Sequence, residues 1–155
     1  MKKKIIITLS IVLNAIVCTD AQSQEWTKLH TSIYSIVVEG DFLWIPSDIG
    51  LIRLDKTTEE TVIYDCSEVN TPNIGGPLYG GILEIDANGN KWIGTQYGLV
   101  FYDGGNWVLY DTSNSDICAN IIHNLKMDKD GSLWVVASFG SIQAVNCLMK
   151  FDRTS

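Results

Sequence analysis

Short apolar runs alternate with turns rich in Gly, Asn and Asp along most of the chain. The runs carry Trp, Ile, Val, Leu and Tyr, a composition typical of β-strands. No segment shows a convincing helical period. The pattern therefore predicts an all-β protein built from short antiparallel strands.

The strand pattern recurs three times, with one tryptophan at the same place in each copy. These residues are Trp44, Trp92 and Trp134, and a Gly follows each of them by six positions. The steps from Trp to Trp are 48 and 42 residues, and a period of about 40 to 50 residues in strand-like sequence indicates β-propeller blades. We expect the blades to cover approximately residues 33–73, 74–120 and 121–155.

Each repeat position has a physical role. The turns at residues 86–89 and 128–131 end in Asn-Gly or Asp-Gly, which tolerate positive φ and favour tight hairpins. The tryptophan that follows offers a large apolar face, so we expect it to be buried between blades in all three copies. The Gly six residues later makes the next turn, where a side chain would clash.

The two ends of the array are out of phase. Residues 61–65 and 107–111 predict a fourth strand in the first two blades, whereas the third copy has an insertion at 141–147 and no matching fourth strand. Residues 26–30 resemble 107–111 and stand alone ahead of the first blade. We expect this strand to complete the last blade, as in propellers whose two ends overlap.

Three blades are fewer than the four to eight of a closed propeller. One interpretation is a homo-oligomer, in which two chains join head to tail and the strand at 26–30 of one chain completes the third blade of the other. The other interpretation is a fragment of a longer protein.

The first residues have the layout of a secretory signal peptide. Three lysines precede an apolar run of 14 residues from Ile5 to Cys18, and Thr19 and Ala21 are suited to cleavage after Ala21. The run is shorter than the roughly 20 residues of a membrane span, although an uncleaved anchor is the alternative. We therefore expect a signal peptide at 1–21 and one domain at 22–155, periplasmic or secreted, with no membrane insertion after cleavage.

Cleavage would leave a strongly acidic chain. Removing three lysines and Asp20 leaves 17 acidic and 8 basic residues. This charge disfavours nucleic acid and anionic membrane surfaces as partners, because phosphate groups require basic residues. Export permits disulfides, but three cysteines remain and their pairing stays open: Cys66, Cys118 and Cys147.

No pattern of catalytic or metal-binding residues stands out. The only histidines are His30, expected in a strand, and His123, expected in the loop into the third blade. There is no nucleophile elbow and no H-E-x-x-H motif. The Asp-rich turns at 86–90 and 128–131 lack the later ligands of a calcium loop. We therefore predict no catalytic residue, no metal and no cofactor, and a protein that is not an enzyme.

The best candidates for binding lie in the turns between each tryptophan and its Gly. Such turns gather on one face of a propeller, around the mouth of the channel. We interpret these residues as a binding surface, with solvated turn residues as the alternative: Asp48, Gln96, Tyr97 and Phe139.

The segment Trp92-Ile93-Gly94-Thr95-x-x-Gly98-Leu99, with Asp-x-x-Gly before it and Tyr102-Asp103 after it, resembles the two-component regulator propeller repeat. The first copy departs with Pro46-Ser47 and the third with Val136-Ala137. In that family such repeats form the periplasmic sensor part of bacterial hybrid histidine kinases. The resemblance implies an exported binding module whose ligand is a glycan or another protein. Under the fragment interpretation, it implies that the chain is a piece of a longer sensor.

Two other functions stay open. Streptogramin-type lyases use propellers with similar repeats, a His base and a metal, and His123 is the residue placed to serve as that base. Proteins with WD repeats use the same face as a scaffold for other proteins. Activity on ring-closed esters would indicate the lyase, and glycan binding would favour the sensor over the scaffold.

Overall fold

The structure is a computed structural model that describes residues 31–67, 69, 78, 80–140 and 146–151. The chain divides into two compact units, residues 1–31 and 32–155. The predicted signal peptide at 1–21 and the predicted strand at 26–30, including His30, lie outside the described residues. Across the described ranges, no helix is long and apolar enough to cross a membrane.

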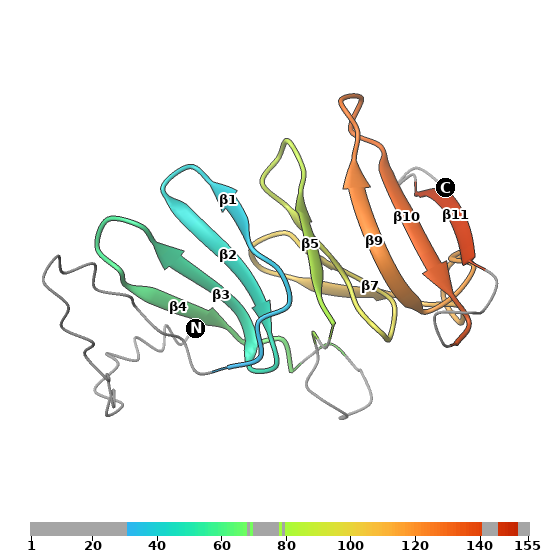
Figure 1. The fold of residues 1–155 in the computed structure, drawn as a ribbon, viewed down its shortest axis with the longest axis horizontal. Helices are drawn as coiled ribbons and strands as arrows, with labels where there is room; N and C mark the ends of the chain where they lie inside the picture. The colour runs from blue at the N-terminus through green and yellow to red at the C-terminus, as the bar shows by residue number, and fades with distance from the viewer. Residues whose placement is uncertain (1–30, 68, 70–77, 79, 141–145, 152–155) are drawn as a thin grey trace, which may run out of the picture. The chain divides into compact units, whose positions relative to one another are not determined.

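The described residues form eleven strands in three antiparallel sheets that follow the order of the chain (Figure 1). The first sheet comprises β1 (Val37–Glu39), β2 (Phe42–Ser47), β3 (Gly50–Asp55) and β4 (Thr61–Tyr64). The second comprises β5 (Ile82–Ile85), β6 (Lys91–Gly94), β7 (Leu99–Tyr102) and β8 (Trp107–Tyr110). The third comprises β9 (Ile121–Met127), β10 (Leu133–Ser138) and β11 (Asn146–Phe151). Each sheet is one blade of the repeat, so the prediction of an all-β protein made of propeller blades is confirmed.

The third blade is smaller than the other two. Blades 1 and 2 have four strands each, whereas blade 3 has three within the described residues, in the order β11-β10-β9. Its β11 begins at Asn146, after the inserted segment, and pairs with the whole of β10. The residues that follow β11 lie outside the described residues, so the expectation that blade 3 lacks a fourth strand of its own stays a prediction.

Each tryptophan is tied to the hairpin that precedes it, a contact that the sequence analysis missed. The indole Nε1 of Trp44 donates a hydrogen bond to Glu39 Oε2 at 2.6 Å, and that of Trp92 donates to Asp86 Oδ2 at 3.3 Å. Trp134 repeats the arrangement with Asp128 at 2.9 Å. The acidic residue of the hairpin thus fixes the orientation of the ring that follows it, because a buried indole N–H requires an acceptor.

The spacing between Trp and Gly has a steric cause in blades 1 and 2, but the expected clash is absent in blade 3, where a Cβ on Gly140 would meet nothing within 4 Å. Gly98 has a φ of 141°, and a Cβ at this position would lie 2.3 Å from the carbonyl oxygen of Tyr110. Gly50 occupies the same place in blade 1, with a φ of 130° and Tyr64 O at 2.6 Å. Gly is therefore required at these two positions for two reasons, the positive φ of the turn and the close approach of the outermost strand of the blade.

The core lies between consecutive blades. We call the face that carries the tryptophan the front of a blade and the opposite face its back. The front of blade 1 packs on the back of blade 2 in one apolar cluster that includes Trp44, Leu83 and Ile93. The front of blade 2 packs on blade 3 in a second cluster that includes Trp92 and Leu125.

Trp134 departs from this arrangement, and the expectation that all three tryptophans are core residues is wrong for this one. Trp92 is 2% exposed, whereas Trp134 is 39% exposed. The cause is its place at the end of the array. The following blade covers the fronts of blades 1 and 2, and within the described residues no blade follows blade 3.

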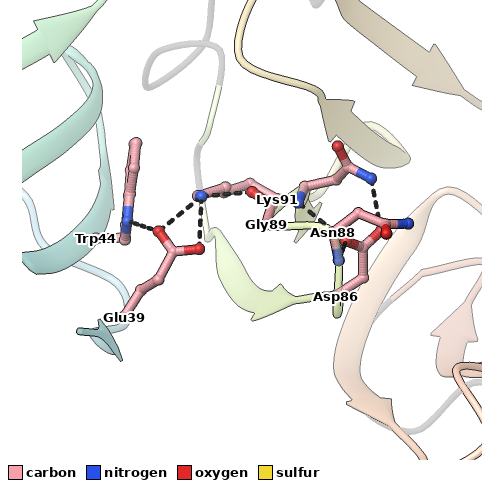
Figure 2. A network of polar contacts seen from close by, with 7 residues as sticks. Glu39, Trp44, Asp86, Asn88, Gly89 and Lys91 are labelled. Atoms are coloured by element: carbon pink, nitrogen blue, oxygen red, sulfur yellow. Dashed lines mark hydrogen bonds and ion pairs between the residues drawn. The ribbon is translucent and has the colours of Figure 1, made fainter.

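Ion pairs join consecutive blades as well. Figure 2 shows the first, in which Lys91 Nζ of blade 2 lies 2.9 Å from Glu39 Oε2 of blade 1 and also donates to the carbonyl oxygen of Gly89. The same ammonium lies 4.0 Å from the centre of the Trp44 ring. Because the Lys91 side chain is almost fully buried, loss of these partners would leave an unpaired ammonium inside the protein.

One disulfide closes blade 3. Cys118, in the connection ahead of β9, is bonded to Cys147 of β11. Cys66 is free and buried, and burial raises the pKa of its thiol to about 12. The pairing that the sequence left open is therefore assigned within the described residues.

Candidate functional site

The turns between the second and third strands of each blade lie at the same end as the connections between blades. The backbone N–H of Ile122, at the start of β9, donates to the carbonyl oxygen of Thr95 at the end of β6. In blade 1 the N–H of Ser32 donates to Asp48 Oδ1 at 3.2 Å. These two bonds place the entry to blade 3 against the turn of blade 2, and the entry to blade 1 against its own turn.

Buried hydroxyl groups shape two of these turns. Thr95 Oγ1 donates to the carbonyl oxygen of Gly98 at 2.9 Å and accepts the N–H of Tyr97 at 3.0 Å. Ser47 makes the same two bonds in blade 1, to Gly50 O at 2.7 Å and from Ile49 N at 3.3 Å. The hydroxyl three residues after the tryptophan thus closes the turn from inside and holds its backbone in one shape.

The structure brings an apolar or aromatic residue to the same place in all three turns. Tyr97 and Phe139 were predicted from the sequence, and Ile49 completes the set. Phe139 is 75% exposed, Ile49 is also exposed, and Tyr97 is half-buried. Each residue stands five positions after its tryptophan, so the repeat register contained the signal for Ile49. Single exposed apolar residues are common on protein surfaces and need no explanation. An apolar or aromatic residue at the same position of all three turns is a property of the repeat.

The predicted polar residues lie beside this set. Asp48 is half-buried and accepts the bond from Ser32, and Gln96 is exposed. A Cβ on Gly80 would lie 3.5 Å from Gln96 Cγ, so this side chain runs along the connection into blade 2. Asp48 and Gln96 therefore each lie in a turn of their own blade, next to the chain that enters that blade.

His123 does not lie in the loop into blade 3, as the sequence analysis expected, but within β9. Val136 of β10 faces Asn124 and Ala137 faces Ile122, so His123 is the extra residue of a β-bulge. Its Nε2 lies 2.6 Å from Ser138 Oγ, and that hydroxyl also donates to Gly140 O. Bulges redirect side chains and are frequent beside functional sites. This one directs an imidazole to the turn that carries Phe139.

The carboxylates of the hairpins at the other end of the blades are fully engaged. Burial acts to raise the pKa of Asp86, but hydrogen bonds from Asn90, Trp92 and Asn88 outweigh it, and the pKa is lowered. The hydrogen bond from Trp134 is the main cause of the lowered pKa of Asp128. Across the described part of the chain, no three His, Cys, Asp or Glu side chains are grouped to hold a metal ion. The hairpin carboxylates therefore serve the fold.

Solved structures share this arrangement of blades. The extracellular domain of the hybrid two-component system BT3049 from B. thetaiotaomicron matches with a TM-score of 0.57 and 19% identity over 83% of this chain. That of BT4673 from the same organism matches with a TM-score of 0.55 and 18% identity over 82%. A streptogramin B lyase matches with a TM-score of 0.51 and 12% identity over 81%.

These likenesses establish the fold alone, because sequence identities this low do not extend to function. They confirm the expected likeness to the propellers of two-component sensors. The chain spans 19% and 16% of the two sensor domains and 42% of the lyase. No family model matches the sequence, and no curated protein matches it significantly.

Proposed function

We propose that this chain is an exported, sensor-like binding module and that it takes its ligand on the surface formed by the three turns. We call this surface the turn face and define it by Asp48, Ile49, Gln96, Tyr97 and Phe139. The observation that carries the proposal is the apolar or aromatic residue that recurs at the same place in each turn, exposed in two turns and half-buried in the third. The likeness to extracellular domains of two-component systems supports both the export and the sensing role.

The chemistry of the turn face favours a neutral oligosaccharide. Binding sites combine apolar and aromatic surface with a few polar groups that fix orientation. Phe139, Tyr97 and Ile49 offer the apolar surface, and Gln96 and Asp48 offer an amide and a carboxylate. The net charge of −7 disfavours polyanionic glycans, because like charges repel at short range.

Calorimetric titration with a series of neutral oligosaccharides tests the proposal. Phe139→Ala and Tyr97→Ala should each weaken binding about fivefold, which corresponds to about 1 kcal/mol for a lost aromatic contact. Val108→Ala is the matched control, since Val108 is also exposed but lies on β8, away from the turns. The proposal fails if no oligosaccharide binds, or if the control weakens binding as much as the turn variants do.

A lyase is the second candidate, and two observations favour it. They are the structural likeness to streptogramin B lyase and the position of His123 in the bulge. A lyase of this kind would open the ring-closed ester of streptogramin B, with His123 as the base. Mass spectrometry would detect the linear product, and His123→Ala should abolish it. Unchanged streptogramin B after prolonged incubation would contradict this candidate.

A further inference from the structure

One position of the repeat carries a cation in blade 1 and a core residue in blade 2. It lies on the third strand of each blade, directly opposite the tryptophan, and it holds Arg53 opposite Trp44 and Phe101 opposite Trp92. Cross-strand partners share one face of a sheet, so this residue lies on the front of its blade. Phe101 is 3% exposed and belongs to the core between blades 2 and 3. Lys150 holds the position in blade 3, whose front is not covered within the described residues.

Aromatic rings hold Arg53 in place. Its guanidinium carbon lies 4.6 Å from the centre of the Phe42 ring and 6.0 Å from that of Tyr64. Such contacts attract a cation to the ring face and orient the planar guanidinium. The ion pairs of the described chain are those of Lys91 and Lys126, and the Arg53 side chain makes no hydrogen bond in that part of the protein. Its N–H donors are therefore fixed in position without a protein acceptor there.

Two tyrosine hydroxyls beside Arg53 also lack a partner among the described residues. Tyr64 and Tyr102 have ring centres 5.6 Å apart, and neither hydroxyl makes a hydrogen bond there. Tyr102 is 5% exposed, but no fully buried polar side-chain atom of the described chain is unpaired, so its hydroxyl reaches the surface. The pKa of Tyr102 is raised to about 12, mainly by burial and in smaller part by Tyr64 and Asp103, while Arg53 acts to lower it. The hydroxyl is therefore a hydrogen-bond donor at neutral pH, close to the guanidinium.

A tryptophan of blade 2 completes this group of side chains. The ring of Trp107 stacks on that of Tyr102, with centres 4.1 Å apart. We call the group the seam cluster, because its members come from the second to fourth strands of blade 1 and the third and fourth strands of blade 2. It depends on neither the residues before blade 1 nor those after blade 3. Its members are Phe42, Arg53, Tyr64, Tyr102 and Trp107.

The matching rings between blades 2 and 3 show that packing does not require a cation here. Phe101 takes the place of Arg53 and lies against Trp92, with ring centres 4.6 Å apart. Tyr110 and Phe151 pack on the same group, with centres 5.0 Å apart. Rings alone therefore fill this position between two blades, and the arginine of blade 1 requires another explanation.

The charges around the seam cluster limit what it can bind. Arg53 is its only cation, and two carboxylates stand close by, Asp55 on the same strand and Asp103 directly after Tyr102. Arg53 contributes to the lowered pKa of Asp55, although backbone hydrogen bonds from Thr58 and Thr57 are its main causes. One cation beside two carboxylates favours a ligand with a single negative charge over a phosphate dianion, because like charges repel.

We propose that the seam cluster is a second binding site, which takes a single carboxylate carried on a ring, as in a hexuronic acid or an aromatic acid. Arg53 binds the carboxylate through two parallel hydrogen bonds, the geometry that a guanidinium favours. The hydroxyls of Tyr64 and Tyr102 donate to its remaining lone pairs, and Trp107 packs on the ring that carries it. The site uses no residue of the turn face.

Calorimetric titration with sodium benzoate and sodium glucuronate tests the proposal and distinguishes the two kinds of ring. Each acid is compared with a neutral counterpart, benzamide for benzoate and methyl glucoside for glucuronate. At least one acid should bind, and its neutral counterpart should bind about tenfold more weakly or less, because hydrogen bonds to a charged group are the stronger ones. The acid that binds more tightly identifies the kind of ring.

Substitutions assign the binding to the seam cluster. Arg53→Gln should weaken binding of the acid about tenfold or more, and Tyr102→Phe about fivefold, since each removes donors to the carboxylate. Lys129→Gln is the matched control, because Lys129 is an exposed cation in a hairpin of blade 3. It should leave the affinity unchanged.

Arg53→Phe distinguishes a binding role from a structural one. Blade 2 has phenylalanine at this position, so the variant should fold and melt no lower than the unaltered chain, while binding of the acid is lost. Circular dichroism measures the melting. If the variant does not fold, Tyr102→Phe decides instead, because it removes only a hydroxyl that has no partner in the described chain.

Four results would overturn the proposal. Neither acid binds, the neutral counterparts bind as tightly as the acids, inorganic phosphate binds more tightly than both acids, or Lys129→Gln weakens binding as much as Arg53→Gln does. Because the acids are titrated without any oligosaccharide, failure of this proposal leaves the test of the turn face unaffected.

Discussion

At the scale of single residues, the tryptophan of each repeat shows how one sequence position meets different surroundings. Trp92 packs against the tilted ring of Phe101, with ring centres 4.6 Å apart, and donates its N–H to Asp86. Trp134 keeps the bond to its own hairpin aspartate, but its ring faces outward. The hydrogen bond is a property of the blade, whereas burial of the ring is a property of the interface.

This difference predicts unequal effects of the same substitution. Trp92→Ala should lower the free energy of unfolding by about 3–5 kcal/mol, the usual cost of truncating a buried Trp. Trp134→Ala should cost about 1–2 kcal/mol, because part of its ring is already in water and one hydrogen bond is lost. Urea unfolding measures both values.

Equal losses at the two positions would contradict the distinction between a covered front and the exposed front of blade 3. An unchanged unfolding curve for Trp92→Ala would show that Trp92 is not part of the core.

At the scale of strands and turns, regular features could be predicted from the sequence and irregular ones could not. The hairpins and the Gly turns follow from local chain geometry, so Asp86–Gly89 and Gly98 were readable from residue type and spacing. The bulge at His123 depends on the register between β9 and β10, which pairs residues that are far apart in the sequence. The exposure of Trp134 depends on whether another blade packs on the front of blade 3, and the residues around Trp134 do not indicate this.

Only the part of the candidate site that follows the repeat could be predicted from the sequence. The position of Tyr97 and Phe139 follows from the repeat, and the structure places both in equivalent turns. Ile49 was overlooked because an aliphatic side chain does not suggest binding when it is considered alone. Its significance comes from the register that it shares with the two aromatic residues.

The disulfide gives blade 3 a constraint that the other blades lack. It joins β11 to the connection before β9 across a separation of 29 residues. The chain-entropy relation for a loop of this length gives a stabilisation of about 3–4 kcal/mol. Blade 3 has the smallest sheet in the described chain, so the bridge compensates for hydrogen bonds that a fourth strand would supply.

Reduction of this bridge should therefore lower the free energy of unfolding by about 3–4 kcal/mol. Urea unfolding with and without a reducing agent measures the loss. A double variant, Cys118→Ser with Cys147→Ser, should be less stable from the start and insensitive to the reducing agent. Equal stability of the oxidised and reduced chains would show that the bridge does not hold blade 3.

At the scale of the whole molecule, the order of the blades is specified by contacts outside the repeat. Lys91 pairs with Glu39 across the first interface, and Lys126 pairs with Glu84 at 2.8 Å across the second. These charged residues differ from copy to copy, whereas the apolar positions recur. The apolar repeat explains why blades stack, and the ion pairs distinguish one interface from the other. Together they form a scaffold on which the turns are displayed.

The central claim is that this scaffold binds its ligand on the turn face. Hydrogen–deuterium exchange, with and without the tightest-binding oligosaccharide of the calorimetric series, tests it most directly. Slower exchange on binding is expected in three turns, at residues 47–50, 95–98 and 138–140. The hairpins at the opposite end should keep their rates, at residues 55–60, 86–91 and 128–133. Protection of these hairpins, with unchanged exchange in the turns, would contradict the account.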